Sequence, residues 1–171
     1  GVCVKPQHTL DQLLTMQPQL VVLLAHARDP GNIGTVIRCA DAAGADAVVV
    51  SDASVDPYNP KAVRASAGSV FHLPVVVGPT VEFAVSEFRA AGLKIFAADG
   101  VGSSDLDDLA DDGSLIPASA WIFGNEAWGL PEQTRALADV VVRVPIYGAA
   151  ESLNLATAAA VCLYASARAH R

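Results

Sequence analysis

The sequence predicts an α/β fold, in which a mostly parallel sheet carries helices on both of its faces. Short apolar runs rich in Val, Leu and Ile recur along the chain, and such runs suit strands that are buried on both sides. Segments with helical periodicity lie between these runs. Strands and helices in strict alternation are typical of one parallel sheet covered by helices.

The individual elements are bounded by residues that begin or end helices. Gly44 is expected to end the first long helix, Pro60 to lie in the first turn of the next, and Thr80 to cap a third. Residues 1–18 are polar and are expected to be irregular. The expected strands span 20–27, 46–50, 73–78, 93–99, 119–124 and 139–145, and the expected helices span 32–44, 60–68, 80–92, 131–138 and about 152–168.

The composition is that of a core-rich domain. The chain has 171 residues, of which 52% are apolar and 17% charged. These values exclude a disordered chain and suit about one domain. No apolar run approaches the roughly 18–20 residues that cross a bilayer, and the first residues do not form a signal peptide. We therefore expect a soluble, cytoplasmic protein without a membrane partner.

The charge is unevenly distributed. A net charge of -7 argues against a surface that binds nucleic acid by charge alone. Much of the acid crowds into residues 99–112, which are expected to form a solvated loop. Four basic residues lie in or beside the first half of the fold and leave room for a local basic patch: Arg28, Arg38, Lys61 and Arg64.

Cysteine and histidine are too scattered to form a disulfide framework or a metal site. Cys3, Cys39 and Cys162 form no C-x-x-C pair, and the four histidines show no ligand spacing. Cys39 and Cys162 lie in apolar helical patterns and are expected to be small buried side chains. No metal is expected.

Three loops rich in Gly and polar residues each follow a predicted strand. They read RDPGNIG at 28–34, GNEAWGLP at 124–131 and PIYGAAESLN at 145–154. Because parallel sheets bind ligands at the carboxyl ends of their strands, these loops predict one binding site. The first loop lacks the G-x-G-x-x-G fingerprint and no P-loop occurs, which disfavours a dinucleotide-dependent oxidoreductase.

Ser152 and Asn154 have two interpretations. Both residue types commonly cap a helix N-terminus, and an Ala-rich helical run follows them. Their loop, however, is one of the three at the predicted binding edge. The two roles are compatible, because the turn that caps a helix can also face a site. Asn32 has the same two interpretations at the start of the helix 32–44.

The three loops also carry spaced motifs. Asn32-Ile-Gly34-Thr-Val-Ile-Arg38 has the form N-x-G-x-x-x-R, and Gly124-Asn-Glu126-Ala-Trp-Gly129-Leu130 has the form G-x-E-x-x-G-L. Pro145-Ile-Tyr-Gly148-Ala-Ala-Glu-Ser152-Leu153-Asn154 has the form P-x-x-G-x-x-x-S-L-N. In this order, each after a strand, they resemble the SpoU/TrmH family of RNA ribose 2′-O-methyltransferases, within the SPOUT superfamily. The resemblance runs from about residue 20 to residue 168.

The resemblance implies a SPOUT fold over residues 19–171, with a trefoil knot formed by the C-terminal segment. It also implies S-adenosylmethionine as the cofactor, held by loops in which Gly permits close backbone approach. By position, the cofactor-binding residues are Ala98, Gly124, Asn125, Gly129, Val144, Ile146 and Leu153.

The same resemblance implies that Arg38 acts on the target ribose 2′-hydroxyl, at the pocket of the partner subunit in a homodimer. As an isolated residue, Arg38 reads as a solvated helix arginine. A role as general base conflicts with the charge that guanidinium groups carry in proteins. Two roles therefore stay open. Either the site lowers the pKa of Arg38 strongly enough for it to act as a base, or Arg38 stays charged, orients the hydroxyl and stabilises the developing oxyanion. The other catalytic residues implied are Asn32, Glu126, Ser152 and Asn154.

The expected function is S-adenosylmethionine-dependent methylation of a ribose 2′-hydroxyl in RNA, with ribosomal RNA favoured over transfer RNA. Arg38, Lys61 and Arg64 are expected to contact the RNA. The alternatives are a transfer-RNA methyltransferase and a non-catalytic SPOUT-fold module that binds RNA or the cofactor. Because residue 1 is not Met, residues 1–18 are expected to be a linker or docking segment that follows an N-terminal RNA-binding domain.

Overall fold

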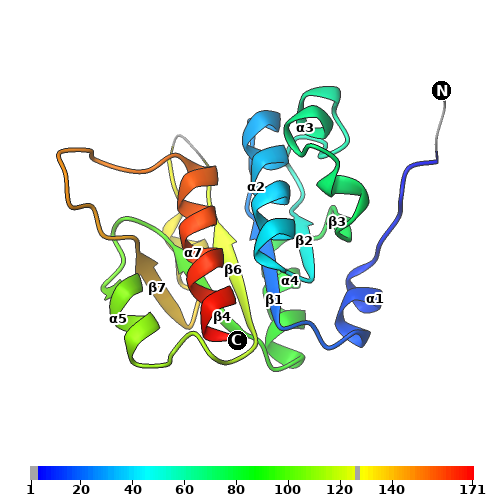
Figure 1. Ribbon diagram of the computed structural model, residues 1–171. Helices are drawn as coiled ribbons and strands as arrows, with labels where there is room; N and C mark the ends of the chain where they lie inside the picture. Colours follow the sequence, from blue (N-terminus) through cyan, green and yellow to red (C-terminus); the bar gives the residue numbers. More distant parts are fainter. Residues whose placement is uncertain (1–3, 126–127) are drawn as a thin grey trace.

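The computed structural model describes residues 4–125 and 128–171, and the strands in these ranges form one parallel sheet (Figure 1). The strand order is β3-β2-β1-β6-β4-β7-β5. The strands are β1 (Leu20–Leu24), β2 (Ala47–Val50), β3 (Val75–Val77), β4 (Lys94–Ala98), β5 (Ser104–Asp105), β6 (Ser119–Phe123) and β7 (Val140–Arg143). The helices are α1 (Leu10–Thr15), α2 (Pro30–Ala43), α3 (Pro60–Ala65), α4 (Val81–Ala90), α5 (Leu106–Asp111), α6 (Glu132–Arg135) and α7 (Leu155–Ala169), with a 3-10 turn at Ser69–Phe71.

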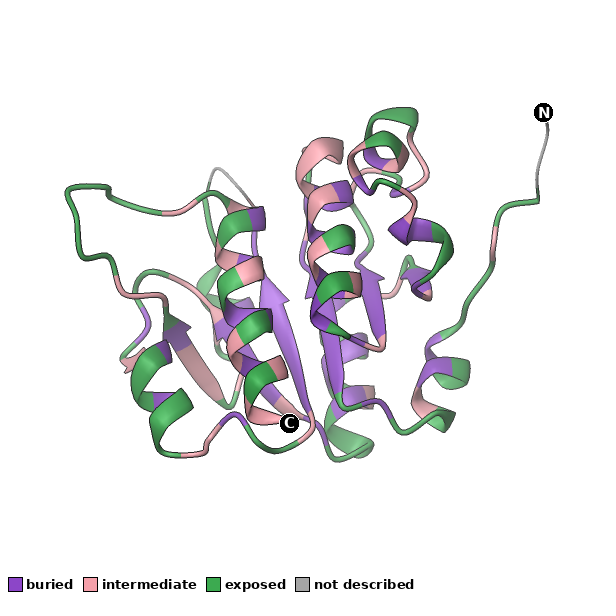
Figure 2. Ribbon diagram, viewed as in Figure 1, coloured by how far each residue is buried: buried purple, intermediate pink, exposed green. Residues whose placement is uncertain are grey.

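Two hydrophobic cores lie on opposite faces of the sheet. Successive side chains of a strand point to opposite faces, so Val22 and Leu24 enter one core while Val21 and Leu23 enter the other. Helices α2, α5 and α7 cover the first face, and α1 and α4 cover the second (Figure 1). Figure 2 shows the central strands β1, β2 and β6 as buried along their whole length. The predicted parallel sheet with helices on both faces is therefore confirmed.

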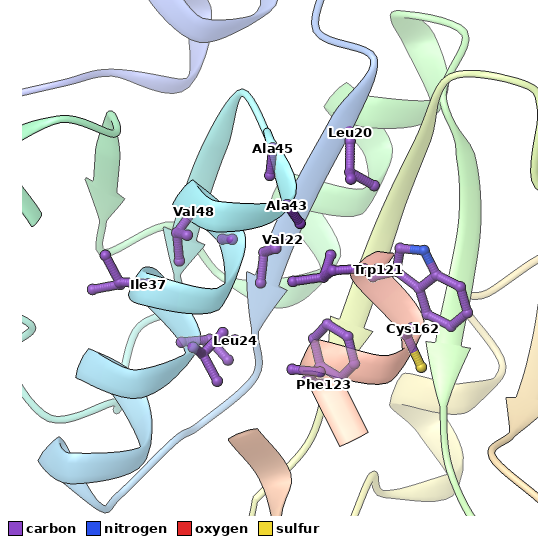
Figure 3. Packing of buried hydrophobic residues seen from close by; sticks show 14 of the residues in the cluster. Leu20, Val22, Leu24, Ile37, Ala43, Ala45, Val48, Trp121, Phe123 and Cys162 are labelled. Carbon is purple, nitrogen blue, oxygen red and sulfur yellow. The ribbon is translucent and has the colours of Figure 1, made fainter. Parts of the chain in front are cut away.

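An aromatic stack fills the centre of the first core (Figure 3). Trp121 on β6 is fully buried and stacks against Phe96 and Phe123, with ring centroids 4.9 and 6.0 Å away. Its indole N–H donates to Ser166 Oγ at 2.9 Å, so α7 is joined to the sheet by a buried hydrogen bond. Cys162 is buried beside them as predicted, and burial raises the pKa of its thiol. Cys39, predicted to be buried, is only half-buried.

The predicted end signals are confirmed at three helices. Gly44 follows α2 with φ 78, Pro60 begins α3, and Thr80 accepts a hydrogen bond from the first turn of α4. Other boundaries shift: the strands and the helices α3 and α6 are shorter than expected, and two helix starts differ. α2 begins at Pro30 and is capped by Asp29, and α7 begins only at Leu155.

The expectation of an irregular N-terminal segment is wrong for residues 10–15. Thr9 and Gln12 form a reciprocal capping box that starts α1, and Leu10 and Leu13 are buried in the second core. Lys5 pairs with Asp56 at 3.2 Å. The segment therefore packs on the domain.

The expectation of a solvated acidic loop at residues 99–112 is also wrong. The stretch contains β5 and α5, because Leu106 and Leu109 pack into the first core while the neighbouring carboxylates remain exposed. Asp99 and Asp105 are less exposed than the other acidic residues of this stretch, with side chains 10% and 19% exposed.

Strand order brings distant loops together. β6 lies between β1 and β4, and β7 lies on the other side of β4. The register aligns Leu24, Phe123, Ala98 and Val142 across these four strands, so their carboxyl ends lie at one edge. The knot stays a prediction. Across the described ranges, no helix is long and apolar enough to cross a membrane.

Candidate active site

A cavity of about 710 Å³ opens at the carboxyl ends of β4, β6 and β7. This volume lies within the range of small-molecule sites, roughly 300–1,000 Å³. The turn after β4, the loop after β6, the loop after β7 and the first turn of α7 form its walls. The walls thus come from segments that are far apart in sequence and adjacent only through the strand order.

The cavity collects the residues that the resemblance assigned to the cofactor. Ser152 and Asn154 lie in the same wall, whereas Glu126 falls outside the described residues. The structure places the residues assigned to the cofactor in the cavity wall, whereas their contacts with a ligand stay a prediction. The seven lining residues in question are Ala98, Gly124, Asn125, Gly129, Val144, Ile146 and Leu153.

The glycines of the second motif permit a tight backbone turn. Asn125 and Gly129 exchange two backbone hydrogen bonds, of 3.0 and 2.9 Å. A Cβ at Gly124 would lie 2.4 Å from the Gly129 carbonyl oxygen, so only Gly fits there. Gly129 itself has φ 64, a conformation in which Gly avoids strain. The backbone geometry alone therefore requires Gly124 and favours Gly129, whether or not a ligand binds.

Asn125 joins this turn to the neighbouring loop. Its side-chain amide donates to the His26 carbonyl at 3.1 Å, just after β1. The loop after β6 is thereby fixed to the loop that leads into α2, which carries the first motif.

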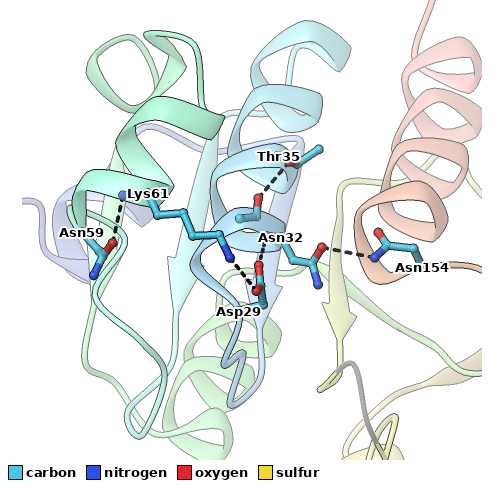
Figure 4. Close-up of polar contacts among 7 residues, drawn as sticks. Asp29, Asn32, Thr35, Asn59, Lys61 and Asn154 are labelled. Atoms are coloured by element: carbon cyan, nitrogen blue, oxygen red, sulfur yellow. Dashed lines mark hydrogen bonds and ion pairs between the residues drawn. The ribbon is translucent and has the colours of Figure 1, made fainter.

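Asn154 has both of the roles considered from the sequence (Figure 4). Its Oδ1 accepts from the Ala156 backbone N–H at 2.9 Å and so caps α7. Its Nδ2 donates to Asn32 Oδ1 at 3.2 Å, which links the third motif to the first across 122 positions of sequence. Ser152 lines the cavity but does not cap the helix.

Asn32 is positioned by Asp29, the cap of α2. Asp29 Oδ1 accepts from the Asn32 backbone N–H at 2.9 Å, and Lys61 Nζ on α3 lies 3.0 Å from Asp29 Oδ2 (Figure 4). The Asn32 N–H and then Lys61 hold the pKa of the Asp29 carboxyl below its usual value. Lys61 therefore supports the first motif, besides any contact with RNA.

Arg38 does not line the cavity of its own chain. It is exposed on α2, six residues beyond Asn32, which is about 9 Å along the helix and on a different side of it. Arg64 is likewise exposed, on α3. The structure thus brings together Asn32, Ser152 and Asn154 and leaves these two arginines on the surface.

Sequence reasoning missed the charged residues of the cavity wall. Asp99, Asp105, Arg143 and Glu151 all line it. Arg143 Nε lies 3.4 Å from Asp105 Oδ2, so these two charges are paired. Asp99 ends the predicted strand 93–99 and Arg143 lies near the end of the predicted strand 139–145, so their place at the carboxyl edge was the available signal. The acidic run that contains Asp99 and Asp105 was instead expected to be solvated.

A parallel sheet that holds such a cavity between Gly-rich loops at its carboxyl edge defines an α/β protein with a small-molecule site. The chain belongs to the SpoU rRNA Methylase family, whose family model matches residues 19–164. The resemblance that the three motifs indicated is therefore confirmed.

Curated relatives and solved structures agree with this assignment. The chain is 39% identical over 164 residues to 23S rRNA (guanosine(2553)-2′-O)-methyltransferase RlmP of Bacillus subtilis, covering 96% of this chain and 62% of that protein. It is 39% identical over 168 residues to 23S rRNA (uridine(2479)-2′-O)-methyltransferase of Streptomyces viridochromogenes, covering 95% and 57%. The chain thus spans about three-fifths of these relatives.

The fold is similar to that of the SpoU methyltransferase AviRb from Streptomyces viridochromogenes in complex with the cofactor AdoMet. The TM-score is 0.83 at 37% identity, and the match covers 95% of this chain and 65% of that one. This likeness supports the SPOUT fold that the resemblance implied.

Proposed function

We propose that this chain is the catalytic domain of an enzyme that transfers a methyl group from S-adenosylmethionine to a ribose 2′-hydroxyl of ribosomal RNA. The observation that carries the proposal is the cavity at the carboxyl ends of β4, β6 and β7. It is lined by seven residues matching cofactor positions, and one of its lining residues, Asn154, is bonded to Asn32. The relatives named above act on 23S rRNA, and AviRb binds AdoMet.

The cavity fits the cofactor in charge as well as in volume. Among its described lining residues, three carry carboxylates and one carries a guanidinium, an excess of negative charge that suits a cationic ligand. Gly124 and Gly129 present only main-chain atoms to the cavity, so a ligand can approach the backbone closely at these two positions. Bound there, S-adenosylmethionine would supply an electrophilic methyl group.

The chain's own residues would position the ribose. Asn154 and Asn32 hold each other at the rim, and we propose that with Ser152 and Glu126 they fix the loop and the substrate. Arg38 would orient the 2′-hydroxyl and stabilise the oxyanion charge that develops as its proton leaves to solvent. This electrostatic role keeps the guanidinium charged, in contrast to a role as base.

Arg38 would reach a cavity only in a second copy of the chain. It shares the outer side of the α2–α7 pair with apolar groups: Val161 is 40% exposed and Tyr164 is 55% exposed, at helical spacing on α7. Helices α2 and α7 lie side by side on one face (Figure 1). We propose that this surface forms a two-fold dimer contact, the commonest type of symmetric assembly.

The remaining assignments concern the substrate and the setting. We propose that Lys61 and Arg64 contact RNA phosphates, that residues 1–18 connect to an N-terminal RNA-binding domain, and that the protein is cytoplasmic. The fragment alone should then bind RNA weakly and methylate it poorly. Tight, salt-sensitive RNA binding by residues 1–171 alone would contradict this division of labour.

The test of the reaction uses the longest natural chain that contains these residues. RNA from a deletion strain is incubated with the enzyme and methyl-labelled S-adenosylmethionine, and ribosomal and transfer RNA are then separated. We expect label in ribosomal RNA, recovered as a 2′-O-methyl nucleoside. Label in transfer RNA alone would favour the transfer-RNA alternative, and cofactor binding without label in either fraction would favour a non-catalytic module.

The shared site is tested by mixing two variants, each of which should retain at most about a tenth of wild-type activity. Arg38→Ala removes the arginine, whereas Asn154→Asp disables the cavity that receives it. After random reassociation, about half of the dimers are heterodimers with one intact site of two, so activity should return to about a quarter of wild type. Activity that stays at the level of the separate variants in the mixed sample, with heterodimers demonstrated, would mean that each cavity uses its own Arg38.

A further inference from the structure

Asp99 lies at the carboxyl end of β4 and lines the cavity, yet both of its oxygens are used within the protein. Oδ1 accepts from the Val101 backbone N–H at 3.1 Å, and Oδ2 accepts from the Leu130 backbone N–H at 3.1 Å. Its side chain is only 10% exposed. The carboxylate therefore connects the turn after β4 to the last residue of the second motif.

Arg135 on α6 binds the carbonyl group of Leu130, the residue whose N–H donates to Asp99. Its Nη1 donates to the Leu130 carbonyl oxygen at 2.7 Å and lies 3.4 Å from Asp99 Oδ2. The N–H of Leu130 is thus held by a carboxylate and its C=O by a guanidinium. The two charges neutralise each other at short range, and both are less than one-third exposed.

Leu130 transmits this restraint to the cavity wall. It is 1% exposed in the second core, and the preceding Gly129 lies directly over the Asp99 carboxylate, where a Cβ would be 3.2 Å from Oδ2. Gly129 in turn exchanges backbone hydrogen bonds with Asn125, which lines the cavity. Displacing Leu130 would therefore displace the wall that Gly124, Asn125 and Gly129 form.

We propose that Asp99 and Arg135 are positioning residues that hold the cavity wall formed by Gly124, Asn125 and Gly129 in its ligand-binding conformation. They act through Leu130, and the inference rests on the proposed function of the cavity as the S-adenosylmethionine site. Charge-assisted hydrogen bonds to backbone groups suit this task, because they are shorter and stronger than neutral ones.

The decisive variant is Asp99→Asn, which keeps the size of the side chain but removes its charge. The matched control is Asp139→Asn. Asp139 accepts from the Ile95 backbone N–H at 2.8 Å and from Arg89 at 2.8 Å, so it makes the same kinds of bond at the opposite end of β4, away from the cavity. Both variants should lower the melting temperature, and only Asp99→Asn should alter the ligand site.

The readouts are the Kd of S-adenosylhomocysteine by calorimetry and the KM and kcat of the full-length enzyme. Losing one charge-assisted contact on the wall should raise the Kd and the KM for the cofactor by about 10- to 100-fold, with a smaller change in kcat. Arg135→Met should have the same effect, and Arg135→Lys should recover part of it. The Leu130 amide should exchange faster with solvent in Asp99→Asn and not in Asp139→Asn.

Three results would overturn the inference. They are an unchanged Kd in Asp99→Asn, an equal loss in Asp139→Asn, and normal binding in Arg135→Met. If Asp99→Asn fails to fold, Arg135→Met and Arg135→Lys decide the question by the same measurements. Wild-type protein that is folded but binds no S-adenosylhomocysteine would instead refute the proposed cofactor site, and the inference with it.

Discussion

Replacing Gly124 by Ala tests whether the second motif is a backbone requirement. The added Cβ would lie 2.4 Å from the Gly129 carbonyl oxygen, 2.5 Å from its carbon and 2.8 Å from the Leu130 nitrogen. The first distance is 1.0 Å below the 3.4 Å of an ordinary contact. All three neighbours are backbone atoms, so none can turn aside as a flexible side chain would.

The turn must therefore either keep its conformation under strain or change its conformation and open. If it stays, overpacking should lower the free energy of unfolding by about 1–3 kcal/mol. For a chain of this length that is a fall in melting temperature of about 2–12 °C. If the turn opens, the wall of the cavity moves and S-adenosylhomocysteine should bind at least about tenfold more weakly, equivalent to about 1.4 kcal/mol.

Gly100→Ala is the control, because Gly100 lines the same cavity and a Cβ there meets nothing within 4 Å. Urea denaturation gives the free energy of unfolding of each variant, and calorimetry gives the Kd. Gly100→Ala should keep wild-type stability. Wild-type stability together with wild-type affinity in Gly124→Ala would refute the reasoning, since a backbone contact of 2.4 Å cannot be relieved without one of the two losses.

Three further expectations follow from individual contacts. Asn154→Asp keeps the oxygen that caps α7 but loses the amide that donates to Asn32, so methylation should fall at least about tenfold with stability within about 0.5 kcal/mol of wild type, by parallel activity and urea measurements. Asp29 has a pKa lowered below 3.8, chiefly by the Asn32 N–H, so its ionised form stabilises the fold above that pH and the benefit is lost as pH falls through the folded pKa. The advantage of wild type over Asp29→Asn should thus be present at pH 7 and vanish on acidification in urea melts, and an advantage that persists in acid would contradict the assignment. Ser166→Ala leaves the buried Trp121 N–H without its acceptor and should cost about 1–3 kcal/mol, whereas a cost near zero would mean that another acceptor replaces it.

Several features of this protein follow from local sequence alone. The apolar runs set the strands, because a strand buried on both faces has no polar side. Gly44, Pro60 and Thr80 set helix ends through dihedral angles and hydrogen bonds that involve only adjacent residues. Two of the motifs contain glycines that the backbone requires: a Cβ at Gly34 would lie 2.2 Å from the Ala62 carbonyl oxygen, and a Cβ at Gly124 would lie 2.4 Å from that of Gly129.

Other expectations were wrong where the local sequence only weakly favours a helix and packing against a core stabilises it. The helix α1 and the helix α5 are each six residues long and would be marginal in isolation, but each buries two leucines against a core. Their polar residues dominate the composition, whereas the few leucines decide the structure. An acidic run therefore looked solvated in the sequence although part of it is folded.

Only the tertiary structure decided which loops meet. The sequence predicts strands but not their neighbours, and the placement of β6 between β1 and β4 depends on packing over the whole sheet. That order brings Asn154 to Asn32 across 122 positions. It also buries Asp99 against Leu130 and Arg135, although the acidic residues of α5 remain exposed. The local sequence thus identifies the residue types of the site. The cavity and the charged contacts that position its wall form only when long-range strand pairing has brought the loops together.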